Sequence, residues 1–186
     1  MKLNATTPRQ KYELFEGRNI DAMPTLVADS RVPMNVSELM QKRLDVRNSK
    51  DAELKVSWHD NYFDTGDGAL YFLDGSLFVA YDAKALREMT SQSKLVSGAL
   101  DLSGVDLKDV SGVKFTKEQL EQMVLGKPLT LKQAESHPIW VALARRKDLA
   151  KDYAIMVFAE TKERFGYDTN MSIYLDQSGK VPKMRA

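Results

Sequence analysis

The residues best suited to do chemistry are gathered in one short tract, positions 58–68 of this 186-residue chain. His59, Asp60, Asp64 and Asp67 place an imidazole and three carboxylates close together in sequence. Hard divalent cations such as Mg²⁺, Mn²⁺ and Ca²⁺ bind carboxylate oxygens in proteins. If the tract forms a loop, Asp60, Asp64 and Asp67 could converge on such a cation, with His59 as a further catalytic group. The chain would then be a metal-dependent hydrolase.

The same tract has the composition of a turn, and this is the interpretation we favour. Aspartate, asparagine and glycine are common in turns, because their side chains bond to local backbone or leave the chain free to bend tightly. On this interpretation the carboxylates are solvated, no cofactor is expected, and a bound divalent cation remains the alternative.

Two motifs built on closely spaced aspartates do not fit. A calcium-binding EF-hand loop needs oxygen ligands at alternate positions and a terminal glutamate, and the spacing fails from either Asp60 or Asp64. The triplet Asp64-Thr65-Gly66 resembles the active-site triplet of aspartic proteases, whose chemistry needs a second aspartate. The chain has no second copy of the triplet, so only a homodimer could supply it.

Nucleotide-binding motifs also fail. Thr65-Gly66-Asp67 followed by Asp74-Gly75 resembles a short motif of adenylate-forming enzymes, a resemblance that implies an aspartate holding ribose hydroxyls. It covers about a dozen residues, and the glycine-, serine- and threonine-rich phosphate loop of those enzymes is missing. A P-loop and a dinucleotide-binding glycine motif are missing too. No family is identified across the whole chain.

The tract leads into an aromatic β-hairpin. Residues 69–72 and 77–81 are rich in strand formers, and Asp74-Gly75 between them is a strong signal for a tight, primed turn. Residues 58–82 hold seven of the chain's 16 aromatic residues. One face of a hairpin cannot hide all of them, so the exposed ones predict an interface, with Trp58, Tyr62 and Phe63 as its candidate residues. The partner would be another protein or a second copy of this chain.

Charge distribution suggests a third function. Residues 58–82 carry five aspartates and no lysine or arginine, so this segment has charge −5 and the rest of the chain +6, for a net charge of +1. The basic residues of the C-terminal region could bind nucleic acid if they shared one face: Arg145, Arg146, Lys147, Lys151, Lys180, Lys183 and Arg185. This alternative is not favoured, because Asp148 and Asp152 weaken the local field.

Composition excludes several classes of protein. The chain is 43% apolar and 28% charged, as in packed globular proteins, and it has no cysteine. Disulfides, thiolate metal sites and a cysteine nucleophile are therefore excluded. No secretory signal is visible, and the longest apolar run is far shorter than the ~20 residues of a membrane span. We expect a cytoplasmic protein without a membrane partner.

The expected fold is one α+β domain over residues 1–186, with residues 1–50 as a helical extension packed on it. A small antiparallel sheet around the hairpin should pack against several short helices, followed by a C-terminal helix and a terminal hairpin. Helices are expected at 8–16, 36–46, 82–89, 139–147 and 148–165, with capping boxes at Thr116–Gln119 and Thr130–Gln133 starting two more. Short strands are expected at 25–27 and 54–58, and the terminal hairpin at 170–184. The leading hypothesis for function is a non-enzymatic binding or assembly module that acts through protein–protein contacts.

Overall fold

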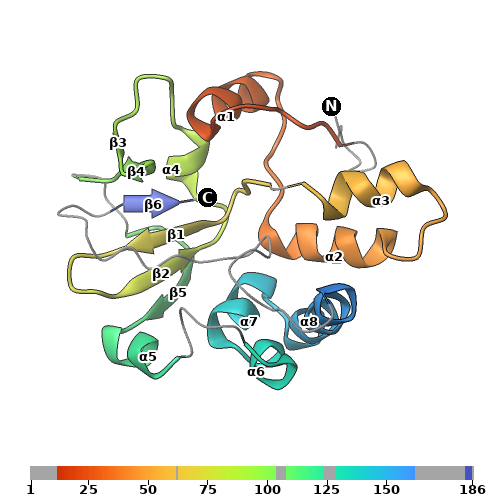
Figure 1. Ribbon diagram of the computed structural model, residues 1–186. Coiled ribbons are helices and arrows are strands. Elements are labelled where there is room, and N and C mark those ends of the chain that lie inside the picture. The colour runs from red at the N-terminus through yellow and green to blue at the C-terminus, as the bar shows by residue number, and fades with distance from the viewer. Residues whose placement is uncertain (1–11, 62, 104–107, 124–128, 162–182, 186) are drawn as a thin grey trace.

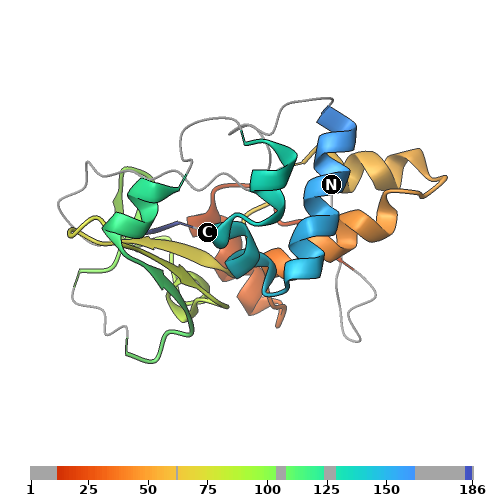
Figure 2. The ribbon, with the colours of Figure 1, turned by 90° about the horizontal axis from the view of Figure 1, so that it is seen from below.

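The computed structural model describes residues 12–61, 63–103, 108–123, 129–161 and 183–185. A sheet occupies one half of the molecule and a group of helices the other (Figure 1), and the view from below shows the same division (Figure 2). The helices are α1 Asn19–Ala28, α2 Val36–Val46, α3 Ala52–His59, α4 Lys84–Arg87, α5 Lys117–Gln122, α6 Leu131–Glu135, α7 Pro138–Ala144 and α8 Lys147–Thr161. The strands are β1 Gly68–Tyr71, β2 Leu77–Ala80, β3 Leu95–Val96, β4 Ala99–Asp101, β5 Gly112–Phe115 and β6 Lys183–Arg185. This mixture of helices and antiparallel strands confirms the α+β class.

The sheet is antiparallel, with the strand order β3-β4-β6-β1-β2-β5. The predicted hairpin forms its centre, with Gly68 paired to Ala80 and Tyr71 to Leu77. Its turn differs from the primed turn that we expected. Gly75 has a φ of +82° but Asp74 is not in the left-handed region, so the loop is longer, with glycine at its last position. The Asp74 carboxylate accepts the backbone N–H of Ser76 at 2.8 Å and fixes the turn.

Both faces of the central hairpin are covered, because successive strand side chains point to opposite sides. Tyr71, Leu77 and Val79 pack against α5 and α7. Leu70 and Ala80, on the other face, pack in a cluster that includes α1 and α4. The aromatic residues of the hairpin are therefore buried or half-buried on two covered faces. The expectation that some of them would be left exposed on an open face is wrong for the aromatics that the structure describes.

The helical half is organised around α2 and α8. Helix α2 covers the predicted range 36–46, and Asn35 starts it by forming a capping box with Glu38. The two capping boxes at Thr116 and Thr130 are also confirmed. Helix α8 packs on α2, α6 and α7 through one apolar cluster, whose most buried members are Met40, Ala134, Ala144, Ala150 and Ala154. The small residues let the helices approach closely.

Several sequence predictions were wrong in the first third of the chain. The strand expected at 54–58 is part of helix α3, because the Asp51 side chain accepts the backbone N–H of Leu54 and caps that helix. The strand expected at 25–27 lies inside α1, which continues through Pro24. Residues 12–16 are not helical, so the helix predicted at 8–16 is wrong over that part, and residues 8–11 lie outside the described ones.

Elements later in the chain differ less from the predicted ones. Asp82 does not cap α4, because Ala83 is the N-cap and Asp82 has a left-handed φ of 46°. The helix predicted at 139–147 is α7, which ends at Ala144, and α8 begins at Lys147. Most of the terminal hairpin predicted at 170–184 lies outside the described residues. The described part, β6, pairs with both β1 and β4 in the main sheet.

Candidate ligand-binding pocket

Gly66, in the aspartate tract, makes backbone hydrogen bonds to two other segments of the chain. Its backbone N–H donates to the Met34 carbonyl at 2.8 Å, and its own carbonyl accepts the N–H of Ala83 at 2.7 Å. A Cβ at this position would lie 3.1 Å from Cγ of Pro33, closer than side chains normally approach. Gly66 therefore lets the tract run directly against the segment that precedes α2.

Asp67 is the most deeply buried carboxylate of the tract, with 1% of its surface exposed. Its Oδ2 accepts the backbone N–H of Val36, the first residue of α2, at 2.9 Å. Its Oδ1 accepts the N–H of Asp82 at 3.0 Å and lies 2.6 Å from Nη2 of Arg145. Burial raises the pKa of the Asp67 carboxyl, and both amides and the guanidinium oppose that rise. The side chain joins the hairpin to α2 and to the end of α7.

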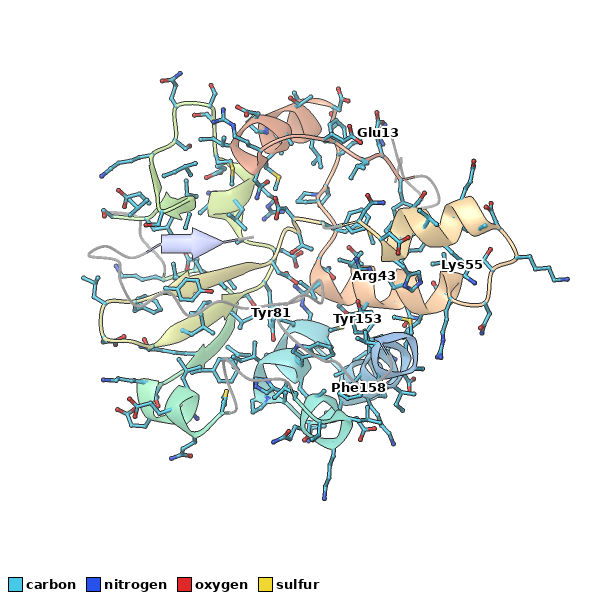
Figure 3. The ribbon with its side chains drawn as sticks, viewed as in Figure 1. Glu13, Arg43, Lys55, Tyr81, Tyr153 and Phe158 are labelled. Carbon is cyan, nitrogen blue, oxygen red and sulfur yellow. The ribbon has the colours of Figure 1, made fainter. Side chains whose placement is uncertain are left out.

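Arg43 fixes the first part of this tract. It is 1% exposed and donates to the carbonyl oxygens of Trp58 at 2.8 Å and Asn61 at 2.9 Å. It also donates to the hydroxyl of Tyr153 at 2.8 Å, and Figure 3 shows these two side chains together between α2 and α8. A cation at the carboxyl end of α3 is favoured by the exposed carbonyls there. Arg43 thus holds the chain in place where it leaves α3.

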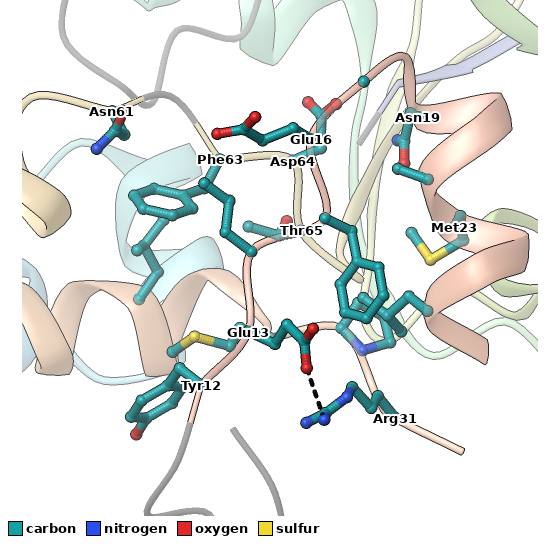
Figure 4. Close-up of a pocket in the computed structure, with 18 of the residues that line it drawn as sticks. Tyr12, Glu13, Glu16, Asn19, Met23, Arg31, Asn61, Phe63, Asp64 and Thr65 are labelled. Carbon is teal, nitrogen blue, oxygen red and sulfur yellow. Dashed lines mark ion pairs between the residues drawn. The ribbon is translucent and has the colours of Figure 1, made fainter. Parts of the chain in front are cut away.

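A pocket of 330 Å³ opens beside this anchored segment. Its walls come from five parts of the chain: residues 12–17, helix α1, the segment 31–34, Leu39 of α2, and residues 58, 61 and 63–65. Most of the wall is apolar, contributed by Tyr12, Leu14, Phe15, Ala22, Met23, Leu26, Val32, Pro33, Met34, Leu39, Trp58 and Phe63. The volume lies at the small end of the range for small-molecule sites. Figure 4 shows its polar side chains among these apolar ones.

At one end of the pocket Arg31 pairs with Glu13, with 2.7 Å between Nη2 and Oε2. Both side chains are largely buried, at 17% and 8% exposure. The Nε and Nη1 atoms of Arg31 are buried and have no hydrogen-bond partner among the described residues. Leaving such donors unmatched is costly, so each one needs a physical explanation. A bound acceptor atom would supply one.

At the other end of the pocket Figure 4 shows the carboxylates of Glu16 and Asp64. Asp64 reaches solvent, but the protein around it still raises the pKa of its carboxyl by desolvation. Asp64 makes no hydrogen bond or ion pair with the residues that the structure describes. The pocket therefore has an acidic end, an apolar middle and an end with unmatched donors.

Comparison with known proteins leaves the family open. No protein-family model matches the chain, and no curated protein matches it. A solved structure described as "Accommodation of massive sequence variation in Nanoarchaeota by the C-type lectin fold" is similar to it, with a TM-score of 0.57 and 16% sequence identity. The match covers 89% of this chain and 81% of that chain. The likeness shows a shared fold. At this identity it shows nothing about a ligand.

The carboxylates predicted as a metal or catalytic cluster have separate surroundings. Asp60 is exposed at the carboxyl end of α3, and Asp64 lines the pocket. The carboxylate of Asp67 accepts hydrogen bonds from two backbone amides and from Arg145. His59 is half-buried in the last turn of α3. Within the described parts of the chain, no three histidine, aspartate or glutamate side chains are grouped to hold a metal ion. The metal hypothesis stays a prediction.

The predicted interface residues are placed differently from each other. Trp58 is 2% exposed, packed between Tyr12 and Phe63 with ring centroids 5.1 and 5.5 Å away, so it offers no exposed ring and contributes only to a pocket wall. Phe63 is half-buried at the same pocket. Tyr62 lies outside the described residues. Any contact through Trp58 or Phe63 would therefore be made inside a pocket instead of on a flat surface.

The basic residues near α8 are partly neutralised. Arg145 contacts Asp67 and Asp82, and Arg146 pairs with Asp148. Lys180 and the side chains of Lys183 and Arg185 lie outside the described residues. None of the helices in the described ranges has the length and apolar character needed to cross a bilayer.

Proposed function

We propose that this protein is a non-enzymatic binding module whose ligand site is the pocket between residues 12–17, α1 and residues 58–65. The observation that carries the proposal is the pair of buried donors in that pocket, the Nε and Nη1 atoms of Arg31, which have no hydrogen-bond partner among the described residues. A ligand that supplies an acceptor would remove this mismatch, and a donor on the same ligand would meet the solvent-exposed carboxylate of Asp64. The solved structure that is similar to this chain is described as having the C-type lectin fold, a fold used for binding, which supports the proposal.

Anchoring of the site supports a role in recognition. Arg43 bonds to the carbonyl oxygens of Trp58 and Asn61, which line the pocket, and Asp67 bonds to the N–H groups of Val36 and Asp82 next to the wall residues. Both side chains are thereby committed to holding the chain in place. A preorganised pocket lowers the cost of ordering residues on binding. The walls are therefore suited to hold a ligand in one orientation.

We take the ligand to be part of another protein, in keeping with the aromatic and methionine-containing wall. Aromatic residues and methionine are enriched at protein interfaces. Selection from a phage-displayed library of random heptapeptides tests this directly. Selected peptides should bind the wild-type protein and lose at least tenfold in affinity to Ala22→Phe, which places a ring on the pocket wall of α1.

Val27→Phe is the matched control. Val27 lies on the same helix, is 42% exposed and is not part of the pocket wall, so this variant should bind the selected peptides like wild type. Selection that enriches no peptide, or peptides that bind Ala22→Phe as well as wild type, would contradict the proposed function.

A further inference from the structure

The two ends of the pocket differ in charge in a way that points to the kind of peptide it binds. We infer that the occupant is a peptide segment of a partner protein that carries a lysine or arginine beside an apolar residue. The basic side chain would face Asp64, and a backbone carbonyl would face Arg31. This inference rests on the proposed function and specifies its ligand.

The Arg31 end favours a neutral acceptor. Glu13 already neutralises the guanidinium through the 2.7 Å ion pair, so a second carboxylate would bring two negative charges to one cation in a largely buried place. A peptide carbonyl supplies the missing acceptor without adding charge. Nε and Nη1 are neighbouring donors on the planar guanidinium, so one carbonyl or two successive ones can satisfy them.

The opposite end favours a cation. Asp64 lines it, and no lysine or arginine other than Arg31 is among the described residues of the pocket wall. An ammonium or guanidinium group would give Asp64 the ionic partner that it lacks in the described structure. Phe63 stands at the same pocket and presents an aromatic side chain, which adds attraction for a cation. The Asp64 carboxylate thus selects the sign of the side chain that enters.

The middle of the pocket favours an apolar residue next to that basic one. Phe15, Met23, Pro33 and Met34 contribute to its wall. Methionine side chains are flexible and adapt to irregular apolar shapes, so the pocket should accept leucine, methionine or phenylalanine with little discrimination. Selectivity would then come from the charged ends.

A free amino acid is the main competing occupant. It also carries a cation and an acceptor, but its acceptor is a carboxylate, which the Glu13–Arg31 pair disfavours. Blocked tripeptides remove that ambiguity because both of their ends are neutral. Isothermal titration with acetyl-Leu-Lys-Phe-amide, acetyl-Leu-Gln-Phe-amide and acetyl-Leu-Glu-Phe-amide compares the three charges on one apolar frame.

We expect the lysine peptide to bind about tenfold more tightly than the glutamine peptide, the effect of one charge-assisted hydrogen bond, and the glutamate peptide to bind most weakly. Asp64→Asn should remove most of the preference for lysine. Asp60→Asn is the matched control, because Asp60 is an exposed carboxylate of the same tract outside the pocket wall. It should leave the three affinities unchanged.

The outcomes separate this inference from the proposed function. Equal binding of the lysine and glutamine peptides, or an unchanged preference in Asp64→Asn, overturns the basic-peptide inference but leaves a peptide-binding pocket in place. Free leucine or lysine binding more tightly than the blocked lysine peptide overturns it in favour of a small zwitterion. If none of the three tripeptides binds and the heptapeptide selection also fails, both proposals fall.

Discussion

The carboxylate of Asp67 lies 2.6 Å from Nη2 of Arg145, although 78 positions separate the two residues in the chain. Asp67 is 1% exposed and lies just before the first strand of the hairpin. Arg145 is the C-cap residue that directly follows α7, and it has a left-handed conformation with a φ of 59°. The contact ties the sheet half of the molecule to the helical half. The two residues are too far apart in the sequence for any local pattern to predict the contact.

Asp67→Ala should destabilise the protein strongly. The substitution leaves the N–H groups of Val36 and Asp82 and the Arg145 guanidinium without an acceptor, and breaking a buried charge pair from one side costs about 3–5 kcal/mol. Arg145→Ala should cost less, about 1–2 kcal/mol, because the Arg145 side chain is 27% exposed and water can reach the remaining carboxylate. Chemical denaturation monitored by circular dichroism measures both free energies of unfolding.

Arg146→Ala is the control for this pair. Arg146 is the next residue and pairs with Asp148, but that pair is mostly exposed, so its loss should change the free energy of unfolding by less than about 1 kcal/mol. Similar costs for Asp67→Ala and Arg146→Ala would show that the Asp67 contact is not a structural anchor.

Arg43 should be needed to keep the pocket in shape. Arg43→Met preserves the length and apolar stem of the side chain but leaves two carbonyl oxygens and the Tyr153 hydroxyl without their donor. Each unsatisfied buried group costs about 1–3 kcal/mol, so we expect a loss of about 3 kcal/mol or more, measured by denaturation. Lys42→Met, on the neighbouring position, loses only the contacts of its ammonium with the rings of Tyr12 and Trp58 and should cost about 1 kcal/mol or less. Equal costs in the two variants would contradict the anchoring role of Arg43.

The sequence predicted the elements whose signals are local. The helix at 36–46, the two threonine capping boxes and the Asp-Gly hairpin are predictable because each depends on residues a few positions apart. The strand prediction at 54–58 is wrong because its apolar residues suit a strand as well as a helix, and the Asp51 cap decides for the helix.

The candidate site was only partly predictable. The tract at 58–68 was identified, and Asp64 and Phe63 do line the pocket. The sequence does not predict Arg31, Glu13 and Arg43 as site residues, because nothing local shows that Arg31 pairs with Glu13 or that an arginine of α2 is 1% exposed. One weak signal is present: Glu13 stands among the apolar residues Tyr12, Leu14 and Phe15.

His137 should make stability depend on pH. Burial lowers the pKa of its imidazole, both ring nitrogens lack hydrogen-bond partners among the described residues, and no charged side chain lines the 400 Å³ cavity beside it in those parts of the chain. In the unfolded chain the imidazole of His137 binds a proton at pH ~6.5. In the folded protein the imidazole is still neutral at that pH, because burial lowers its pKa. Its contribution to stability is therefore present above pH ~6.5 and lost as pH falls from there through the lower folded-state pKa, with a slope of at most about 1.4 kcal/mol per pH unit.

Urea denaturation between pH 5 and 8, roughly the interval that brackets an unperturbed histidine, measures this slope. His137→Gln should flatten it, and His59→Gln, which removes the other of the chain's two histidines, should leave it in place. A slope that persists in His137→Gln and disappears in His59→Gln would refute the assignment.

Divalent cations should bind weakly, because the three carboxylates of the tract have separate surroundings in the structure. The Asp67 oxygens are occupied by two amides and a guanidinium, and Asp60 is exposed at the end of α3, so Asp64 would have to bind a cation without their help. Even with Glu16 at the same end of the pocket, this leaves few oxygen ligands for ions that take six or more. Isothermal titration with Mg²⁺, Mn²⁺ and Ca²⁺ should therefore give the same heats for wild type and Asp64→Ala. A micromolar affinity that disappears in Asp64→Ala would instead support the metal-dependent hydrolase and require the tract to rearrange when the ion binds.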